Sequence, residues 1–233
     1  MTLALEIKGL QAWYGESHIL HDMNLSVAQG EVVTLLGRNG AGRTTTLRAI
    51  MGLTGRRSGS IKINGTETIA LPTHRIAHFG VGYCPEERAI FSSLSAEENL
   101  MLPPTLTAGG MSVAEIYQMF PNLEERRSSQ GTRLSGGEQQ MLAVARILRT
   151  GAKLLLLDEI SEGLAPVIVQ ALSRMISTLK AKGYTIVMVE QNFRFAAPLA
   201  DRFYVIEHGH VVAQFNAAEL STKTDELNEL LGV

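Results

Sequence analysis

A short apolar stretch that leads directly into a glycine-rich turn constrains the fold of this chain most. Residues 31–36 are nearly all apolar and end at Gly37, which is typical of a central strand covered on both faces. The segment from Thr44 to Met51 then has the pattern of a helix that ends at Gly52. A buried strand, a glycine-rich loop and a helix in this order predict an α/β fold built on a parallel sheet.

The loop itself, Gly37-Arg-Asn-Gly-Ala-Gly-Arg-Thr44, has the context of a Walker A phosphate-binding loop. Gly40 and Gly42 allow the backbone to bend so that its N–H groups point at phosphate oxygens, and the following helix adds its positive N-terminal end. Thr44 is placed to bind Mg²⁺. The strict pattern has lysine where this chain has Arg43, and the two residues are not interchangeable at a tight phosphate site. A glycine-rich turn that binds no nucleotide is therefore the alternative for this motif alone.

A second apolar stretch, Leu154 to Leu157, ends in two carboxylates and follows Walker B logic. Asp158, at the carboxyl end of the predicted strand, can hold Mg²⁺ through water, and Glu159 can orient and activate an attacking water molecule. A core strand with two acids at its end is the alternative. The stretch Leu134-Ser-Gly-Gly-Glu-Gln-Gln140 also opens a predicted helix, and its small residues allow a phosphate to approach the backbone closely. A glycine-rich helix cap is the alternative for that segment.

The rest of the chain alternates strands and helices around a helical block. Strands are predicted at 3–7, 81–84, 154–157, 185–189 and 203–207, with a hairpin at Asn64-Gly65. Helices are predicted at 136–150, 166–182, 193–200 and 222–231, and Ser95 and Ser112 precede glutamates at capping-box spacing. We therefore predict one domain over 1–233. Its core is formed by 1–89 and 151–215, including an N-terminal antiparallel β part, with a helical subdomain at 90–150 and a C-terminal helix within 216–233.

Composition limits the partners of this chain. The formal net charge is −2, from 21 basic and 23 acidic residues, which gives no electrostatic case for nucleic-acid binding. Cys84 is the single cysteine, so no intrachain disulfide forms and a reducing compartment fits best. We expect no signal peptide, and no run approaches the roughly 18 apolar residues of a membrane span. If the protein serves a membrane, we expect it to act through partners.

The three motifs, in this order, resemble those of ABC transporter ATPases, and the resemblance covers essentially the whole chain. Tyr14 matches the aromatic residue that stacks on adenine, and Glu86 falls at the position of the glutamine loop. Ser161-Glu-Gly-Leu-Ala-Pro166 matches the loop that crosses to the other subunit, and Gln191 falls where most members have a switch histidine. Glu86 in Cys-Pro-Glu-Glu-Arg and the segment Val-Glu-Gln-Asn at 189–192 are similar to the LivF-type subunit of branched-chain amino-acid importers.

The resemblance implies a set of site residues. It implies ATP binding by Tyr14, Gly37, Arg38, Asn39, Gly40, Ala41, Gly42, Arg43, Thr44, Thr45 and Glu86. It implies Mg²⁺ binding by Thr44, Asp158 and Glu86, and catalytic roles for Glu159 and Gln191. It implies that Leu134, Ser135, Gly136, Gly137 and Glu138 form the signature motif, which closes over ATP held by the opposite subunit.

The resemblance also implies partners and a location. These are a second ATPase subunit, with a homodimer possible in isolation, two permease subunits, a periplasmic binding protein reached indirectly, and the cytoplasmic face of the inner membrane. Because Arg43 and Gln191 replace lysine and histidine, we predict slower hydrolysis at this chain's own ATP than at the partner's. The alternatives are a nucleotide-binding subunit with little ATPase activity, a related urea or amide importer, and an ABC ATPase acting on DNA or ribosomes.

Overall fold

Two β-sheets organise the chain, and the computed structural model describes residues 2–220 and residue 223. The smaller sheet has the order β2-β1-β4-β5 and is antiparallel. Its strands are β1 (Leu3–Tyr14), β2 (Ser17–Ala28), β4 (Arg56–Ile63) and β5 (Thr66–Glu67). Asn64 and Gly65 join β4 to β5 with φ angles of 48° and 80°, as a type I′ turn requires. The predicted hairpin is therefore present.

The larger sheet has the order β10-β9-β3-β8-β7-β6. Strands β3 (Val32–Leu36), β6 (Val81–Cys84), β7 (Leu154–Asp158), β8 (Thr185–Val189) and β9 (Arg202–Glu207) run parallel, and β10 (His210–Asn216) is an antiparallel edge. All five residues of β3 are buried between β8 and β9, which explains the apolar run in the sequence. The carboxyl ends of the parallel strands therefore bring the residues that follow β3, β7 and β8 to one edge.

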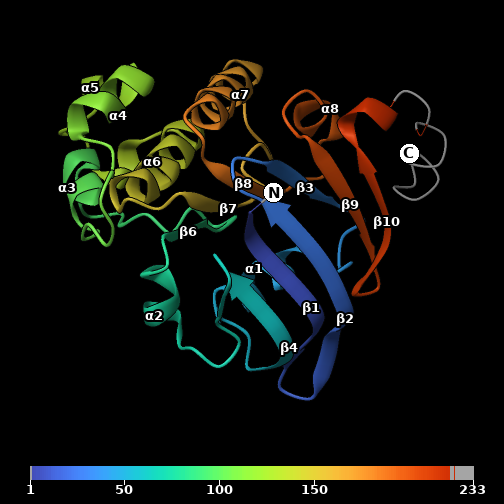
Figure 1. Cartoon of the computed structure of the whole chain (residues 1–233). Coiled ribbons are helices and arrows are strands. Elements are labelled where there is room, and N and C mark those ends of the chain that lie inside the picture. The colour runs from blue at the N-terminus through green and yellow to red at the C-terminus, as the bar shows by residue number, and fades with distance from the viewer. Residues whose placement is uncertain (1, 221–222, 224–233) are drawn as a thin grey trace.

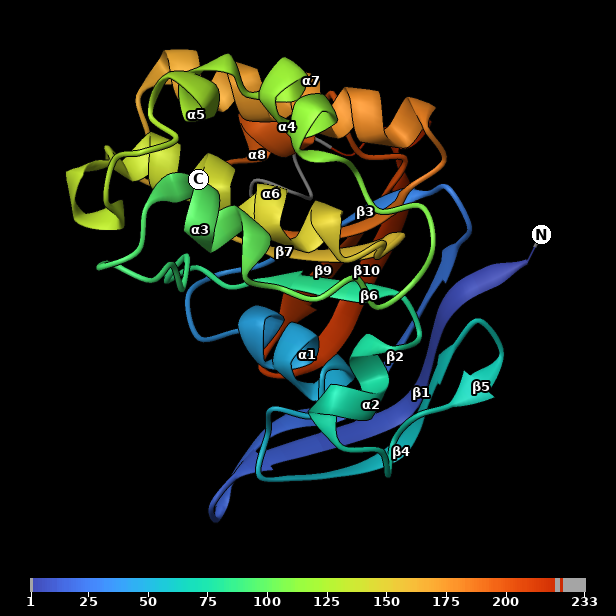
Figure 2. The same cartoon turned by 90° about the vertical axis from the view of Figure 1, so that its left-hand side faces the viewer.

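The helices cover both faces of the larger sheet. Helices α1 (Arg43–Ile50) and α2 (Thr73–Ala77) lie between the two sheets (Figure 2). The other face carries α6 (Gly136–Arg149), α7 (Pro166–Ala181) and α8 (Phe193–Ala196) (Figure 1). Helices α3 (Ala96–Met101), α4 (Val113–Met119) and α5 (Pro121–Glu125) lie beside α6 at the end of the molecule away from β9 and β10. Each face of the sheet thus has its own apolar core.

The α/β fold class is confirmed, and several elements differ from the predicted ones. Strand β2 is missing from the prediction because Asp22, with a φ of 52°, interrupts its alternation of buried and exposed residues. Helix α8 ends at Ala196 rather than at 200, since Pro198 lacks an N–H donor and its ring blocks the turn before it. Apart from residue 223, the helix predicted at 222–231 lies outside the described residues. The division into core and helical subdomain stays a prediction.

The capping boxes are confirmed. The hydroxyls of Ser95 and Ser112 accept from the backbone N–H groups of Glu98 and Glu115, and each glutamate accepts from the backbone of its serine. These reciprocal bonds satisfy donors at the starts of α3 and α4. Among the residues that the structure describes, no helix has the length and apolar character needed to span a bilayer.

Candidate nucleotide-binding site

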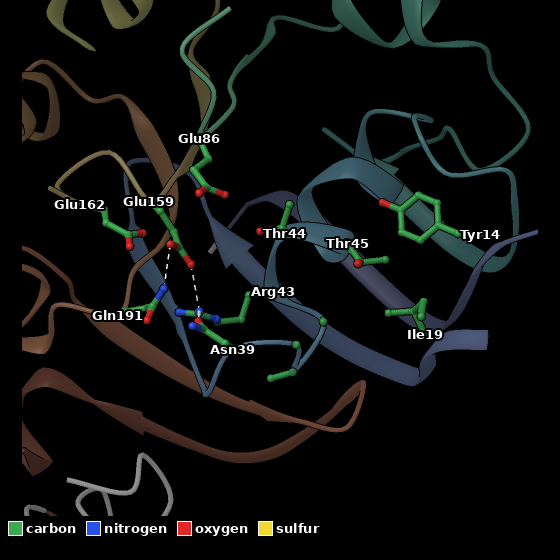
Figure 3. Close-up of a pocket in the computed structure, with 13 residues that line it drawn as sticks. Tyr14, Ile19, Asn39, Arg43, Thr44, Thr45, Glu86, Glu159, Glu162 and Gln191 are labelled. Carbon is green, nitrogen blue, oxygen red and sulfur yellow. Dashed lines mark hydrogen bonds and ion pairs between the residues drawn. The ribbon is translucent and has the colours of Figure 1, made fainter. Parts of the chain in front are cut away.

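A cavity of about 440 Å³ lies at the carboxyl edge of the parallel strands, over the glycine-rich loop (Figure 3). It gathers residues from strands β1 and β2 of the smaller sheet and from the segments that follow β3, β6, β7 and β8 of the larger sheet. Its lining consists of Tyr14, Ile19, Asn39, Gly40, Ala41, Gly42, Arg43, Thr44, Thr45, Glu86, Glu159, Glu162 and Gln191. The structure therefore brings most of the predicted ATP-binding and catalytic residues together. Gly37, Arg38 and Asp158 are not part of the lining.

The glycine-rich loop has the backbone of an anion-binding turn. Gly40 and Gly42 have φ angles of 79° and 106°, which residues with side chains rarely adopt. A Cβ atom on Gly42 would lie 2.8 Å from Leu20 Cδ2, whereas one on Gly40 would meet nothing within 4 Å. Gly42 also caps α1 without a side chain, so the first N–H groups of that helix are left for another partner. The positive end of α1 thus faces the cavity and suits a phosphate group.

Gly37 lies at the start of the loop, where the backbone passes close to β9. A Cβ atom at Gly37 would lie 2.3 Å from the carbonyl oxygen of Ile206 on β9. No side chain fits there without moving the backbone, so glycine allows β3 to turn out of the sheet directly into the loop. Packing against β9 therefore requires glycine at this position of the predicted motif, independently of any nucleotide.

Arg43 forms a buried ion pair with Glu159. Its Nη2 donates to Glu159 Oε1 at 2.9 Å and to Asn39 Oδ1 at 3.3 Å, and Gln191 Nε2 donates to Glu159 Oε2 at 2.8 Å (Figure 3). The Arg43 and Glu159 side chains are only 4% and 8% exposed. Burial lowers the pKa of Arg43, while Glu159 and Asp158 act to raise it. Both oxygens of the predicted catalytic carboxylate are therefore engaged in this conformation.

One nitrogen of the Arg43 guanidinium lacks a hydrogen-bond acceptor. Arg43 Nη1 is buried and has no hydrogen-bond partner among the described residues. A buried cationic donor without an acceptor is costly, and a phosphate oxygen is a strong acceptor for it. The arginine thus suits a phosphate group in the cavity even though it departs from the strict motif.

The hydroxyl of Thr44 and the carboxylate of Asp158 provide oxygen ligands side by side. Thr44 Oγ1 donates to Asp158 Oδ1 at 3.0 Å, and Tyr83 Oη donates to Asp158 Oδ2 at 3.1 Å. Asp158 is fully buried, and burial raises its pKa to about 6. A carboxylate destabilised in this way favours a nearby cation, and hydroxyl and carboxylate oxygens are the ligands that Mg²⁺ prefers. These two residues fit the ion.

Glu86 lies with a different group of acids. One carboxylate oxygen each of Glu86, Glu159 and Glu162 lies within 4.8 Å of the others. Hydrogen bonding to Glu159 raises the pKa of Glu162 to about 7. Glu162 and Ile19 were not predicted as site residues. Ile19 belongs to the missed strand β2, whereas Glu162, in the loop directly after Asp158-Glu159, could have been inferred from its place in the sequence.

The residues of the predicted signature motif lie elsewhere, at the start of α6. Ser135 caps this helix, since its hydroxyl accepts from the N–H of Glu138 and Glu138 accepts from the N–H of Ser135. Leu134 is buried, and a Cβ atom on Gly137 would lie 2.7 Å from Ile168 on α7. None of residues 134–138 lines the cavity described above. Their role toward a second subunit stays a prediction, and within this chain they form a tightly packed helix start.

A further buried acid, Glu190, lies beside the site. It is 1% exposed and accepts from the backbone N–H and the hydroxyl of Ser161 at 3.2 and 2.7 Å. Burial raises the pKa of Glu190 from its ordinary value of 4.5 to about 7, against the opposing effect of Ser161. The folded protein therefore binds a proton at Glu190 more tightly than the unfolded chain does.

This difference predicts a pH-dependent effect of Glu190→Gln on stability. The stability from the protonated carboxyl is complete below the unfolded pKa near 4.5 and is lost as the pH rises through about 7. One pKa unit corresponds to about 1.4 kcal/mol. We therefore expect the free energy of unfolding of Glu190→Gln, relative to that of wild type, to rise by on the order of 2 kcal/mol between pH 5 and pH 8. Urea unfolding without nucleotide measures it. Thr185→Val, which does not titrate, should show the same difference at both pH values, and so would Glu190→Gln if this account were wrong.

Comparison with known proteins identifies the family. Residues 20–162 match the family model described as ABC transporter, which covers more than half of the chain. The chain belongs to the ABC transporter family. The predicted class, an ATP-binding subunit with the ATPase activity of this family, is thereby confirmed.

Three ABC relatives illustrate the match. The chain is 40% identical over 231 residues to the high-affinity branched-chain amino acid transport ATP-binding protein BraG of Pseudomonas aeruginosa, covering 98% of this chain and 99% of the relative. It is 35% identical to the lipopolysaccharide export system ATP-binding protein LptB of Escherichia coli, covering 93% and 92%. A solved ATP-binding subunit of an ABC transporter superposes with a TM-score of 0.82 at 31% identity, covering 99% and 100%.

Proposed function

We propose that this chain binds and hydrolyses MgATP to drive an importer of branched-chain amino acids. The observation that carries the proposal is the single cavity in which the glycine-rich loop, Glu159 and Gln191 meet. The likeness to BraG over nearly the whole length of both chains supports the choice of cargo. A urea or amide importer remains the alternative for the cargo, and an exporter subunit such as LptB is the alternative for the direction of transport.

Each group of residues at the cavity has its own proposed role. Tyr14 and Ile19 form the side of the cavity away from the carboxylates and would contact the adenine (Figure 3). The loop backbone and Arg43 would hold the phosphates, and Thr44 and Asp158 would hold Mg²⁺, which neutralises phosphate charge when bound. Glu159 would accept the proton of the attacking water, and Gln191 would keep its carboxylate in place. Glu86 and Glu162, each with a carboxylate oxygen within 4.8 Å of one of Glu159, would lie beside the attacking water.

The proposed assembly contains two ATP-binding subunits. Residues 134–138 of each chain would close over ATP held by the other, and residues 161–166 would lie at the contact between them. Two permease subunits would carry the cargo across the inner membrane, with this chain bound peripherally at the cytoplasmic face. A periplasmic binding protein would deliver the cargo to the permeases. We propose no nucleic-acid partner.

The test is stimulation of ATP hydrolysis by cargo. The chain is purified with its second ATPase subunit and permeases, reconstituted in liposomes, and supplied with binding protein loaded with leucine. We expect leucine-loaded binding protein to raise ATP turnover several-fold over the unloaded protein. A complex that hydrolyses ATP but responds to urea or acetamide instead would overturn the cargo, and a complex that binds ATP without turnover would support the alternative of a nucleotide-binding subunit.

A further inference from the structure

The proposed catalytic carboxylate sits on a strained turn. Glu159 has a φ of 47°, a left-handed conformation that costs free energy in a residue with a side chain. The residue lies directly after β7, where the chain leaves the sheet. Such conformations persist only where surrounding contacts hold them. The contacts that hold this turn are therefore of interest for catalysis.

Three successive residues, Val189 at the end of β8 and the two that follow it, hold the turn from one side. The carbonyl of Val189 accepts from the backbone N–H of Glu159 at 2.9 Å. Glu190 accepts two hydrogen bonds from Ser161, two residues beyond Glu159, and Gln191 donates to the Glu159 carboxylate itself. Val189 and Gln191 thus bind Glu159, and Glu190 between them binds Ser161.

Glu190 is the polar anchor of this arrangement. Its carboxyl is buried, and both of its oxygens are used on Ser161. Ile160, between the two held residues, is 1% exposed and packs into the core on the face of the sheet that carries α6 and α7. The turn is therefore fixed by an apolar contact at Ile160 and by a polar one at Ser161. Without Glu190, the N–H and hydroxyl of Ser161 would lose their acceptors in a buried place, and the turn would be free to relax.

We propose that Glu190 is a positioning residue for ATP hydrolysis, which fixes the strained turn through Ser161 and so aims the carboxylate of Glu159 at the attacking water. The inference rests on the proposed function, because it needs Glu159 to act on ATP. Glu190 itself touches no part of the cavity that would hold nucleotide. Its effect should thus fall mainly on turnover and change ATP binding little, since the hydrogen bonds that its carboxyl accepts come from Ser161 and not from the glycine-rich loop or Arg43.

The experiment compares Glu190→Leu with Glu190→Gln in the assembled transporter. Glutamine keeps an acceptor for the Ser161 N–H and can donate to its hydroxyl, whereas leucine of similar size offers neither. We expect Glu190→Leu to lower kcat about ten-fold or more with KM for ATP unchanged, because a small misplacement of a catalytic group is costly. Glu190→Gln should restore most of the turnover. Ser161→Ala, a milder change that loses one of the two bonds, should lie between them and serves if the leucine variant does not fold.

Two controls separate positioning from general destabilisation. Thr185→Val removes a part-buried hydrogen bond that Thr185 Oγ1 accepts from the N–H of Gly30 at the other end of β8, so it weakens the same strand away from the turn. It should leave kcat near wild type. Glu190→Leu added to Glu159→Gln should cause no further loss of turnover, because the carboxylate that it positions is already gone.

The outcomes distinguish the two proposals. If Glu159→Gln is inactive while Glu190→Leu has wild-type kcat, the positioning role is wrong and the proposed function stands. An additive loss in the double variant, or an equal loss in Thr185→Val, would also overturn the positioning role. If Glu159→Gln turns over ATP as fast as wild type, the proposed function itself fails.

Discussion

We expect Glu159→Gln to lower ATP turnover about 100- to 1,000-fold in the assembled transporter, through loss of the proposed general base. Glutamine keeps the size of the side chain and one oxygen acceptor, so Arg43 Nη2 still has a partner at the place of Oε1. It cannot take a proton from water. The expected result is therefore a loss of kcat with little change in the affinity for ATP.

Steady-state hydrolysis and equilibrium binding of a fluorescent ATP analogue measure the two quantities separately. The matched control is Glu207→Gln, which makes the same chemical change on an exposed side chain at the end of β9. It should leave both quantities unchanged. If Glu159→Gln reduced ATP affinity as strongly as turnover, Glu159 would be part of the binding site rather than the base.

The sequence predicted those parts of the site that lie on strongly apolar strands and their following loops. The run at 31–36 and the run at 154–157 are buried as expected, and the residues after them, from Gly37 to Thr45 and Glu159, meet at one cavity. Local pattern is enough for this result, because parallel strands end at a common edge. Ile19 escaped prediction because the irregular alternation of β2 hid the strand that carries it.

The contacts inside the site could not be predicted in the same way. Arg43 and Glu159 are 116 positions apart, and their pairing depends on a left-handed turn at Glu159 that no local preference for glutamate favours. Glu190 is similar, since its acidic side chain at the end of an apolar strand gives no sign that it turns inward to Ser161. Both features arise from long-range packing, and both concern how the carboxylate of Glu159, the proposed catalytic base, is held.

The second large effect is expected on ATP affinity and depends on Arg43. Arg43→Ala should weaken ATP binding by about 10- to 100-fold, the equivalent of one charge-assisted hydrogen bond of about 1.5 to 3 kcal/mol. The loss arises because the guanidinium is the buried cation with an Nη1 donor free for phosphate. Arg75→Ala is the matched control, since Arg75 is an exposed arginine on α2 that does not line the cavity. Nucleotide binding by titration calorimetry measures both variants.

Whereas Arg43→Ala is expected to weaken ATP binding, we expect Arg43→Lys to raise turnover. Arginine can donate from Nη1 to phosphate while Nη2 still donates to Glu159 Oε1, so this oxygen must give up a charge-assisted hydrogen bond before it accepts a proton from water. A lysine ammonium that moves to phosphate would release the carboxylate. We expect kcat to rise about ten-fold, since about 1.4 kcal/mol of that charge-assisted bond would no longer oppose proton transfer. Equal or lower turnover in Arg43→Lys would mean that the ion pair does not restrain Glu159 once ATP is bound, and that slow hydrolysis at this site has another cause.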